Sequence, residues 1–249
     1  MATIGPPGGS ITTRVPAAGH DLIYRTKVWV RLVTVALALA FVPIATVIAA
    51  ERPYLPAVPG GLAAGSGEGL TEDAQGFVAW VIETGDNRAA PFLVIDKVNA
   101  TAFAFNREGG LLASSPVLLG LARGDVSPVG IGGRALSSIG PADRITPAGR
   151  FEAAQGVNLE GRKVLWVDYD TALSLHPVVT GAASDRRRQR LASVTASDNR
   201  ISYGCINVPP SFYAEVIAPL FTTNIGIVYI LPETRSIRDV FVARAPSSQ

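Results

Sequence analysis

Ser202-Tyr203-Gly204-Cys205-Ile206-Asn207 contains the only cysteine among the 249 residues of the chain. With no second cysteine, this thiol cannot form an intramolecular disulfide. Because Cys205 follows a glycine and precedes an apolar residue and an amide, the stretch predicts a tight backbone turn that presents the thiol. Such a thiol could serve as a nucleophile; the alternative is a buried cysteine that packs as a small hydrophobic residue.

Histidine is the side chain that most often activates a cysteine nucleophile, and the chain has two. His20 precedes an apolar segment that we expect to cross a membrane, whereas His176 and Cys205 both follow it. His176 ends the strand-like pattern 172–175, and the proline after it favours extended backbone at a strand end. A Cys–His pair would therefore consist of Cys205 and His176; the alternative for His176 is a core histidine with satisfied hydrogen bonds.

The apolar segment 32–50 runs without a charged residue. As a helix rising about 1.5 Å per residue it would span roughly 28 Å, close to the hydrocarbon thickness of a bilayer. Arg25, Lys27 and Arg31 precede it, so the positive-inside rule predicts that residues 1–31 form a cytosolic tail. We expect a single-pass anchor in the cytoplasmic (inner) membrane with the domain in the periplasm; the alternatives are a cleaved signal peptide, with secretion to the periplasm, and a buried core helix.

The positive charge of the chain belongs to its membrane-proximal part. Residues 1–50 carry four of the 22 basic and one of the 20 acidic residues, which leaves 18 basic and 19 acidic residues after position 50. A near-neutral exported domain gives no support for nucleic-acid binding. Outside the cytosol a free cysteine is at risk of oxidation, and this favours a functional role for Cys205.

A flexible linker and a helix are predicted between the apolar segment and the rest of the chain. Residues 51–70 contain three prolines and five glycines, a composition typical of a linker. Residues 71–84 place apolar side chains at helical spacing behind the acidic Glu72 and Asp73. We therefore expect the region 71–90 to form an amphipathic helix packed on the domain.

From residue 91 onward the pattern changes to short apolar segments separated by turn residues, which predicts β-structure. The glycine- and proline-rich residues 120–149 predict a long irregular excursion, of the kind that often carries function or forms a lid. Pro209 and Pro210 predict a helix from Ser211 to about Pro219. The predicted strands cover residues 92–95, 101–105, 111–119, 163–169, 172–176, 201–203 and 225–231.

Thr146-Pro147-Ala148-Gly149-Arg150-Phe151 predicts a turn that leads into a strand. Together with His176 and the stretch 202–207, in this order along the chain, it resembles the L,D-transpeptidase catalytic domain of bacterial cell-wall enzymes. In that family a Thr-Pro-x-Gly-x-Phe turn precedes a histidine, which precedes Ser/Thr-His-Gly-Cys, an apolar residue, and Arg or Asn. The resemblance covers about residues 91–232 and leaves 233–249 as a C-terminal tail.

The resemblance implies a mainly β, sandwich-like catalytic domain with a few short helices. It also implies an acyl-enzyme formed with peptidoglycan stem peptides, in which Cys205 is the nucleophile and His176 its base and later its acid. The acceptor would be a second stem peptide, which gives a cross-link, or water, which gives carboxypeptidase activity. No metal or organic cofactor is implied. The residues that match positions shaping the site are Ser202, Tyr203, Gly204 and Asn207.

Tyr203 stands where the family has a histidine, so the side chain at this position supplies no imidazole. The backbone N–H groups of Tyr203, Gly204 and Cys205 could still stabilise an oxyanion, which is bound chiefly by such donors. The alternative is a catalytically impaired peptidoglycan-binding or scaffold protein that has kept the fold.

The interval between His176 and Cys205 is longer than is usual in the family, and the additional residues map to 181–200. This segment predicts an inserted loop or short helix near the mouth of the site. Guanidinium groups bind carboxylates well, so we hypothesise that one or more arginines of this segment bind carboxylates of the stem peptide. The candidates are Arg186, Arg187, Arg188 and Arg190.

Overall fold

The computed structural model describes residues 69–179, 181–222 and 225–242. The predicted cytosolic tail, the membrane segment 32–50 and most of the linker lie outside these residues. None of the helices within the described ranges has the length and apolarity that crossing a bilayer requires.

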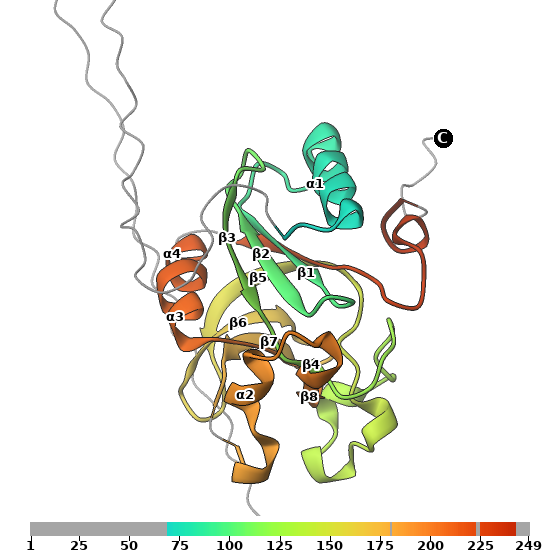
Figure 1. Cartoon of the computed structure of the whole chain (residues 1–249), viewed down its shortest axis with the longest axis vertical. Coiled ribbons are helices and arrows are strands. Elements are labelled where there is room, and N and C mark those ends of the chain that lie inside the picture. The colour runs from blue at the N-terminus through green and yellow to red at the C-terminus, as the bar shows by residue number, and fades with distance from the viewer. Residues whose placement is uncertain (1–68, 180, 223–224, 243–249) are drawn as a thin grey trace, which may run out of the picture. The chain divides into compact units, whose positions relative to one another are not determined.

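One long mixed sheet organises the domain (Figure 1). Its eight strands lie in the order β3-β2-β1-β10-β5-β6-β7-β9, and a second sheet pairs β4 with β8. The pairs β1/β10, β7/β9 and β4/β8 are parallel, and the other pairs are antiparallel. The strands are β1 Phe92–Asp96, β2 Thr101–Phe105, β3 Leu111–Pro116, β4 Leu119–Gly120, β5 Gly149–Val157, β6 Lys163–Asp168, β7 Leu173–Pro177, β8 Arg200–Ser202, β9 Ile206–Val208 and β10 Gly226–Ile230.

Strand β5 belongs to both halves of the large sheet. Its first part pairs with β10, where Ala153 lies opposite Gly226, and its second part pairs with β6, where Ala154 lies opposite Trp166. The prediction of a mainly β domain with a few short helices is confirmed. In place of the two separate sheets of a sandwich, one sheet continues through β5, because a strand of nine residues is long enough to pair with different neighbours along its length.

The main hydrophobic core joins the two halves of the sheet. Leu93 and Ile95 of β1 belong to the same buried cluster as Leu165 of β6, Leu175 of β7 and Ile206 of β9, and none of these five side chains is accessible to solvent. Burying a leucine or isoleucine side chain contributes roughly 1.5–3 kcal/mol. This core therefore fixes the positions of β7 and β9, the two strands that flank the candidate site.

Helix α1, Glu72–Thr84, covers the opposite face of the first half of the sheet. It begins where the Thr71 hydroxyl accepts a hydrogen bond from the Ala74 N–H at 3.2 Å, and it ends at Gly85 in the left-handed conformation. A threonine cap and acidic residues in the first turn both favour a helix start at this point. The helix lies where the apolar spacing of residues 71–84 predicts it.

Strand β1 is buried on both faces because α1 packs on one of them. Phe92 and Val94 lie in a second core cluster with Phe77 and Val81 of α1, whereas Leu93 lies in the main core. A strand covered on both sides has an unbroken apolar sequence rather than an alternating one. This explains the run of apolar residues from 92 to 95.

A single helical stretch occupies residues 210–220. It consists of α3 Pro210–Phe212, a π-helical turn Tyr213–Ile217 and α4 Ala218–Leu220. The stretch ends at Leu220, one residue after Pro219, near which the sequence predicts its end. Proline has no N–H to donate to the preceding turn, and here it follows the wider π turn and stands in the first positions of α4.

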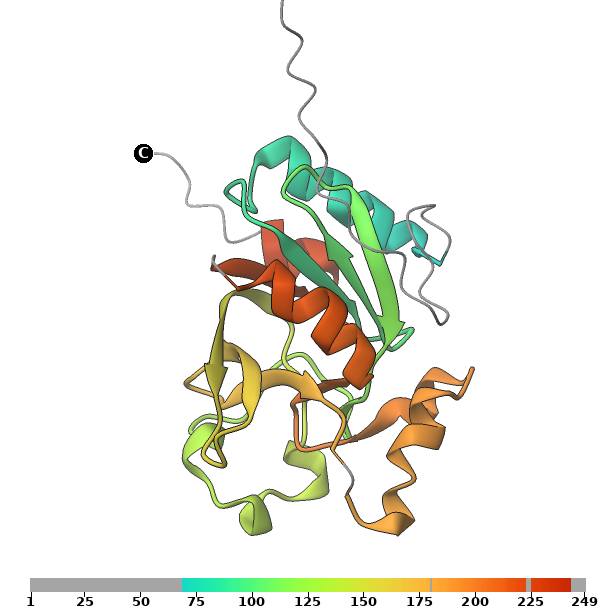
Figure 2. The same ribbon diagram turned by 90° about the vertical axis from the view of Figure 1, so that its left-hand side faces the viewer.

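Two irregular segments lie at one end of the domain in both views (Figures 1 and 2). The predicted excursion 120–149 contains three short 3-10 turns, at Ile131–Gly133, Leu136–Ser138 and Pro141–Asp143. The inserted segment 181–200 contains the predicted short helix, α2 Arg187–Leu191, between 3-10 turns at Ala183–Asp185 and Ala196–Asn199.

The described residues after β10 pack on the domain, although the sequence analysis assigns positions 233–249 to a tail. The side chain of Glu233 is fully buried and forms an ion pair with Arg200 of β8 at 2.6 Å. The carboxylate of Asp125 accepts hydrogen bonds from the backbone N–H groups of Glu233 and Thr234, and it pairs with the buried Lys97 at 2.7 Å. This buried network joins the segment after β10 to the excursion and to the end of β1.

Candidate active site

The turn that carries Cys205 lies between β8 and β9, and its shape depends on Gly204. Gly204 has φ of +134°, and a Cβ at this position would lie 2.8 Å from the carbonyl oxygen of Ile145. Only glycine combines this conformation with so close an approach of another backbone segment. The tight turn predicted around Cys205 is therefore present.

Two hydroxyl groups hold this turn. The Ser202 hydroxyl donates to the Cys205 carbonyl at 2.6 Å and accepts from the Gly204 N–H at 3.1 Å. The buried Thr146 hydroxyl donates to the Gly204 carbonyl at 2.7 Å and accepts from the Gly120 N–H at 2.8 Å. Thr146 thus joins the turn before β5 to the cysteine turn. These two stretches are far apart in the sequence but are in direct contact in the fold.

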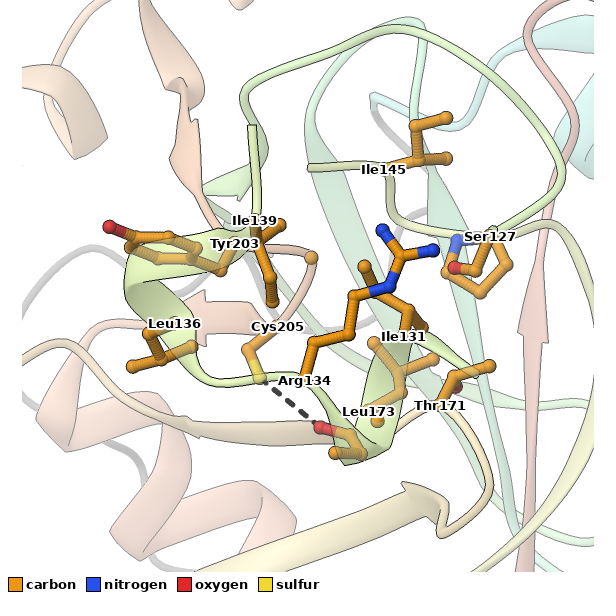
Figure 3. Close-up of a pocket in the computed structure, with 14 residues that line it drawn as sticks. Ser127, Ile131, Arg134, Leu136, Ile139, Ile145, Thr171, Leu173, Tyr203 and Cys205 are labelled. Carbon is orange, nitrogen blue, oxygen red and sulfur yellow. Dashed lines mark hydrogen bonds between the residues drawn. The ribbon is translucent and has the colours of Figure 1, made fainter. Parts of the chain in front are cut away.

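The sulfur of Cys205 lies against β7 (Figure 3). Its Sγ atom is 3.6 Å from the Ser174 hydroxyl and 3.7 Å from the carbonyl oxygen of Ala172, and the side chain is partly exposed. Ser174 is not among the site residues that the sequence predicts. Since side chains two residues apart in a strand point to the same face, its position two residues before His176 was the signal that could have found it.

His176 occupies the end of β7, beside Asn207 of β9. The two residues are paired in the parallel register of these strands, so their side chains lie on the same face. The Nδ1 atom of His176 is 2.8 Å from the Pro177 carbonyl oxygen, and Nε2 is 3.1 Å from Nδ2 of Asn207. The imidazole is therefore held at both nitrogens.

The ionisation of Cys205 and that of His176 are coupled. Burial alone raises the pKa of the thiol and lowers the pKa of the imidazole, because it disfavours both charged forms. The attraction between the two side chains outweighs burial, together with hydrogen bonds from Ser174 to the sulfur and from the imidazole to the Pro177 carbonyl, so the pKa of Cys205 falls below its ordinary value and the pKa of His176 rises above its own. Cys205 and His176 line the same cavity, and each shifts the pKa of the other toward its charged form.

Two backbone N–H groups remain as donors for an oxyanion. The Gly204 N–H is already donated to Ser202, so this third predicted donor is engaged within the turn. Among the residues that the structure describes, the N–H groups of Tyr203 and Cys205 have no hydrogen-bond acceptor. These two amides flank Gly204 and are suited to a charge that develops beside the sulfur.

The ring of Tyr203 is packed against a cation. The guanidinium carbon of Arg144 lies 4.0 Å from the ring centroid, and Arg144 is held by two hydrogen bonds to the Ile139 carbonyl, each 3.2 Å long. Such cation–π contacts stabilise by about 0.5–1 kcal/mol at exposed sites. Figure 3 shows the Tyr203 hydroxyl directed away from the Cys205 sulfur, so the ring forms a wall of the site rather than contributing its hydroxyl to the sulfur.

Two cavities adjoin Cys205 and Tyr203. The smaller, of about 110 Å³, is lined partly by the excursion 120–149, including Ile131 and Leu136. The larger, of about 630 Å³, contains His176 and Asn207 in its lining. The thiol is therefore accessible from two sides, and the irregular excursion forms a wall of the site.

Of the four arginines predicted to bind substrate, only Arg187 lines one of these two cavities. It donates to Oδ1 of Asn207 at 2.9 Å and pairs with Asp185 at 3.1 Å. Arg190 donates instead to the backbone carbonyl oxygens of Asp185 and Asp198. Arg186 and Arg188 are exposed and lie outside both cavities, so the structure does not place these two or Arg190 at the site.

Arg134, which the sequence analysis did not single out, lines the smaller cavity. It forms a half-exposed ion pair with Asp143 at 3.2 Å, which leaves its guanidinium accessible. The only signal in the sequence was its place within the excursion 120–149. Among the described residues there is no group of three or more His, Cys, Asp or Glu side chains that could hold a metal ion.

No family model matches the chain, and no curated protein matches its sequence. Its fold is similar to solved L,D-transpeptidase structures and to the helical cell shape determining protein Pgp2 from Campylobacter jejuni. Pgp2 is 14% identical over 63% of this chain and 55% of its own, with a TM-score of 0.38. The catalytic domain of the Enterococcus faecium L,D-transpeptidase is 18% identical over 57% of this chain and 98% of its own, with a TM-score of 0.27.

An L,D-transpeptidase from Mycobacterium smegmatis is 15% identical over 56% of this chain and 58% of its own, with a TM-score of 0.31. The match therefore spans little more than half the length of Pgp2 and of the mycobacterial enzyme.

Proposed function

We propose that this protein is a cysteine-dependent acyltransferase, and specifically an L,D-transpeptidase that cross-links or remodels peptidoglycan stem peptides. The observation that carries the proposal is the pairing of Cys205 with His176 at a point where two cavities meet at the thiol. A nucleophile beside its base is the arrangement that covalent catalysis requires, and two approaches to the sulfur suit a reaction with a donor and an acceptor.

In the first step the thiolate of Cys205 attacks the carbonyl carbon of a peptide bond in the donor, and a carbon–sulfur bond forms. The negative oxygen of the tetrahedral intermediate accepts hydrogen bonds from the N–H groups of Tyr203 and Cys205. The imidazolium of His176 then gives its proton to the leaving nitrogen, the carbon–nitrogen bond breaks, and a thioester and a free amine result.

In the second step the amine of an acceptor peptide enters after the first product leaves. His176, now neutral, takes a proton from this amine as its nitrogen attacks the thioester carbonyl, and Cys205 departs as a thiolate. A new peptide bond joins donor and acceptor. With water in place of the amine, the same steps release a carboxylic acid, which is L,D-carboxypeptidase activity.

The substrate class is supported by the sequence motifs rather than by the size of the cavities. The turn 146–151, His176 and the stretch 202–207 occur in the order of the L,D-transpeptidase motifs, and Thr146 contacts the cysteine turn directly. We also propose that residues 32–50 anchor the protein in the cytoplasmic membrane and place the domain on the side of its polymer substrate. Reporter fusions on either side of this segment test that topology.

One observation favours a second candidate, a catalytically impaired peptidoglycan-binding protein. Tyr203 replaces the motif histidine, and its ring is held by Arg144, so the site lacks one imidazole of the motif. In this case Cys205 would be unreactive toward acylating agents, although the fold and the cavities would persist.

Intact-mass measurement after exposure to a carbapenem, an acylating probe for enzymes of this class, separates the two candidates. We expect a covalent adduct on the protein, no adduct on Cys205→Ala, and acylation slower by roughly 10²–10⁴-fold in His176→Ala, the range that general acid–base catalysis contributes. Incubation with isolated muropeptides should then give cross-linked or shortened products. A protein that forms no adduct and leaves the muropeptides unchanged is not an enzyme of this kind.

A further inference from the structure

Arg187, in the segment inserted between His176 and Cys205, begins a chain of hydrogen bonds that ends at the imidazole. Its Nη1 atom donates to Oδ1 of Asn207 at 2.9 Å, and Nδ2 of Asn207 lies 3.1 Å from Nε2 of His176. The Arg187 side chain is only 16% exposed and is held in place by Asp185. Asn207 itself is almost fully buried.

The chemical groups of Arg187, Asn207 and His176 determine which group donates and which accepts in each of these hydrogen bonds. A guanidinium group can only donate, so Asn207 must direct its oxygen toward Arg187 and its amide N–H toward His176. The Nε2 atom of His176 must then accept, which leaves the proton of the neutral ring on Nδ1. That proton has an acceptor, the carbonyl oxygen of Pro177 at 2.8 Å.

We propose that Arg187 is a positioning residue, which acts through Asn207 to hold His176 as the Nδ1–H tautomer, with an unprotonated Nε2 atom that accepts the Asn207 amide N–H. The catalytic consequence rests on the proposed function, whereas the tautomer itself does not. A base needs an unprotonated nitrogen, and here a side chain from the inserted segment determines which of the two ring nitrogens that is.

The positive charge of Arg187 also favours the neutral form of His176. It lowers the pKa of His176 and so opposes part of the increase that Cys205 causes. An imidazolium would also direct an Nε2–H toward the amide N–H of Asn207, and the amide cannot reverse while its oxygen is bound to Arg187. The protonated state is therefore one that readily gives its proton to a leaving amine. The other titratable or charged groups lining this cavity are Glu160, Arg162, Lys163, Tyr203, Cys205 and Tyr213.

Nitrogen-15 NMR of the imidazole reads the tautomer directly and needs no substrate. Cys205→Ala is used as the background, because it removes the coupled ionisation of the thiol, and His20→Ala identifies the signal of the other histidine. We expect a single Nδ1–H tautomer in this background. Adding Arg187→Met should give a mixture of tautomers and a higher pKa of His176. The matched control is Arg188→Met, which removes an exposed arginine from the same helix and should change neither.

Two further variants test the role of Asn207 if Arg187→Met disturbs the inserted segment. Asn207→Asp places an acceptor against Nε2, so it should keep that nitrogen protonated and raise the pKa of His176 above that of the background. Arg187→Lys keeps a charged donor and should restore most of the Nδ1–H tautomer. Retention of a single Nδ1–H tautomer in Arg187→Met, or its equal loss in Arg188→Met, would overturn the inference.

The acylation rate separates this inference from the proposed function. With Cys205 intact, Arg187→Met should slow carbapenem acylation by about tenfold, a fraction of what general base catalysis contributes. A tautomer that depends on Arg187 in a protein that forms no adduct supports the inference and contradicts the enzyme. An adduct that forms while the tautomer is indifferent to Arg187 contradicts the inference alone.

Discussion

At the level of single residues, Ser174 stabilises the thiolate form of Cys205. Its backbone and its hydroxyl both hydrogen-bond to the Cys205 sulfur and lower the pKa of the thiol, in addition to the larger effect of His176. A thiol with a lowered pKa reacts as thiolate at lower pH. Ser174 is therefore part of the nucleophile's environment, although it does not transfer a proton.

We predict that Ser174→Ala raises the pKa of Cys205, because the hydroxyl no longer stabilises the charged form. The pH at which iodoacetamide alkylation reaches half its maximal rate should move upward, with the plateau rate at high pH preserved. Ser184→Ala, which changes an exposed serine of the inserted segment, is the control. An unchanged pH profile in Ser174→Ala would show that the hydroxyl has no electrostatic role.

The turn that carries Cys205 has no room for a side chain at Gly204. We predict that Gly204→Ala destabilises the protein by about 1–3 kcal/mol, because alanine is strained at this φ and its Cβ would meet the Ile145 carbonyl. Urea unfolding measures the cost, and carbapenem acylation should be lost with it. Gly133→Ala is the control, since a Cβ there meets nothing within 4 Å; equal stability of the two variants would contradict the prediction.

The site residues that could not be predicted from the sequence reach the cysteine turn from segments that are distant along the chain. Cys205 and His176 could be identified because each is scarce in the chain and because the motifs around them are local. Arg134 and Arg144 belong to a segment without periodicity, and only its folded path brings them to the cysteine turn. The arginines of the insertion could be located near the site, but which of them faces inward depends on the start of α2, which no pattern marks.

At the scale of elements, the excursion 120–149 positions Tyr203 through Arg144. We predict that Arg144→Met removes about 0.5–1 kcal/mol of ring stabilisation, which slows carbapenem acylation by about two- to fivefold if the ring position is coupled to the reaction. Arg123→Met changes an exposed arginine of the same excursion and is the control. Identical acylation rates in the two variants would mean that the ring position does not matter.

The strands and α1 could be predicted because their patterns are local. Apolar runs bounded by turn residues gave β1, β2 and β6 to within a residue or two, and helical spacing gave α1. The order of the strands could not be read in this way. Whether β5 pairs with one neighbour or two depends on contacts between residues far apart in the chain, and a pattern of local hydrophobicity carries no information about them.

At the scale of the whole molecule, the buried network around Lys97 joins segments from four parts of the chain. We predict that Asp125→Asn destabilises the protein by roughly 3–5 kcal/mol, because it leaves a buried ammonium without its nearest carboxylate. Urea unfolding checks this value. The double variant Lys97→Met/Asp125→Leu should be much closer to wild type, and similar losses in both would show that the ion pair itself is strongly stabilising.

The same carboxylate makes stability depend on pH. Desolvation raises the pKa of Asp125, but hydrogen bonds from Lys97 and Thr234 outweigh it and hold the pKa well below its ordinary value of 3.8. Its contribution is therefore complete above that ordinary value and is lost as the pH falls toward the lowered pKa. The free energy of unfolding should decrease below about pH 4, less steeply in the double variant. Equal slopes would contradict this role.

The central position of β10 also determines when the sheet can form. This strand is the last of the described sequence, yet it lies between β1 and β5 and is the only link in hydrogen bonding between the first three strands and the other half. During synthesis, β1 to β3 emerge long before the partner that completes them. The complete sheet therefore cannot form until residue 230 is free to pair, although β1, β2 and β3 can pair with one another before that.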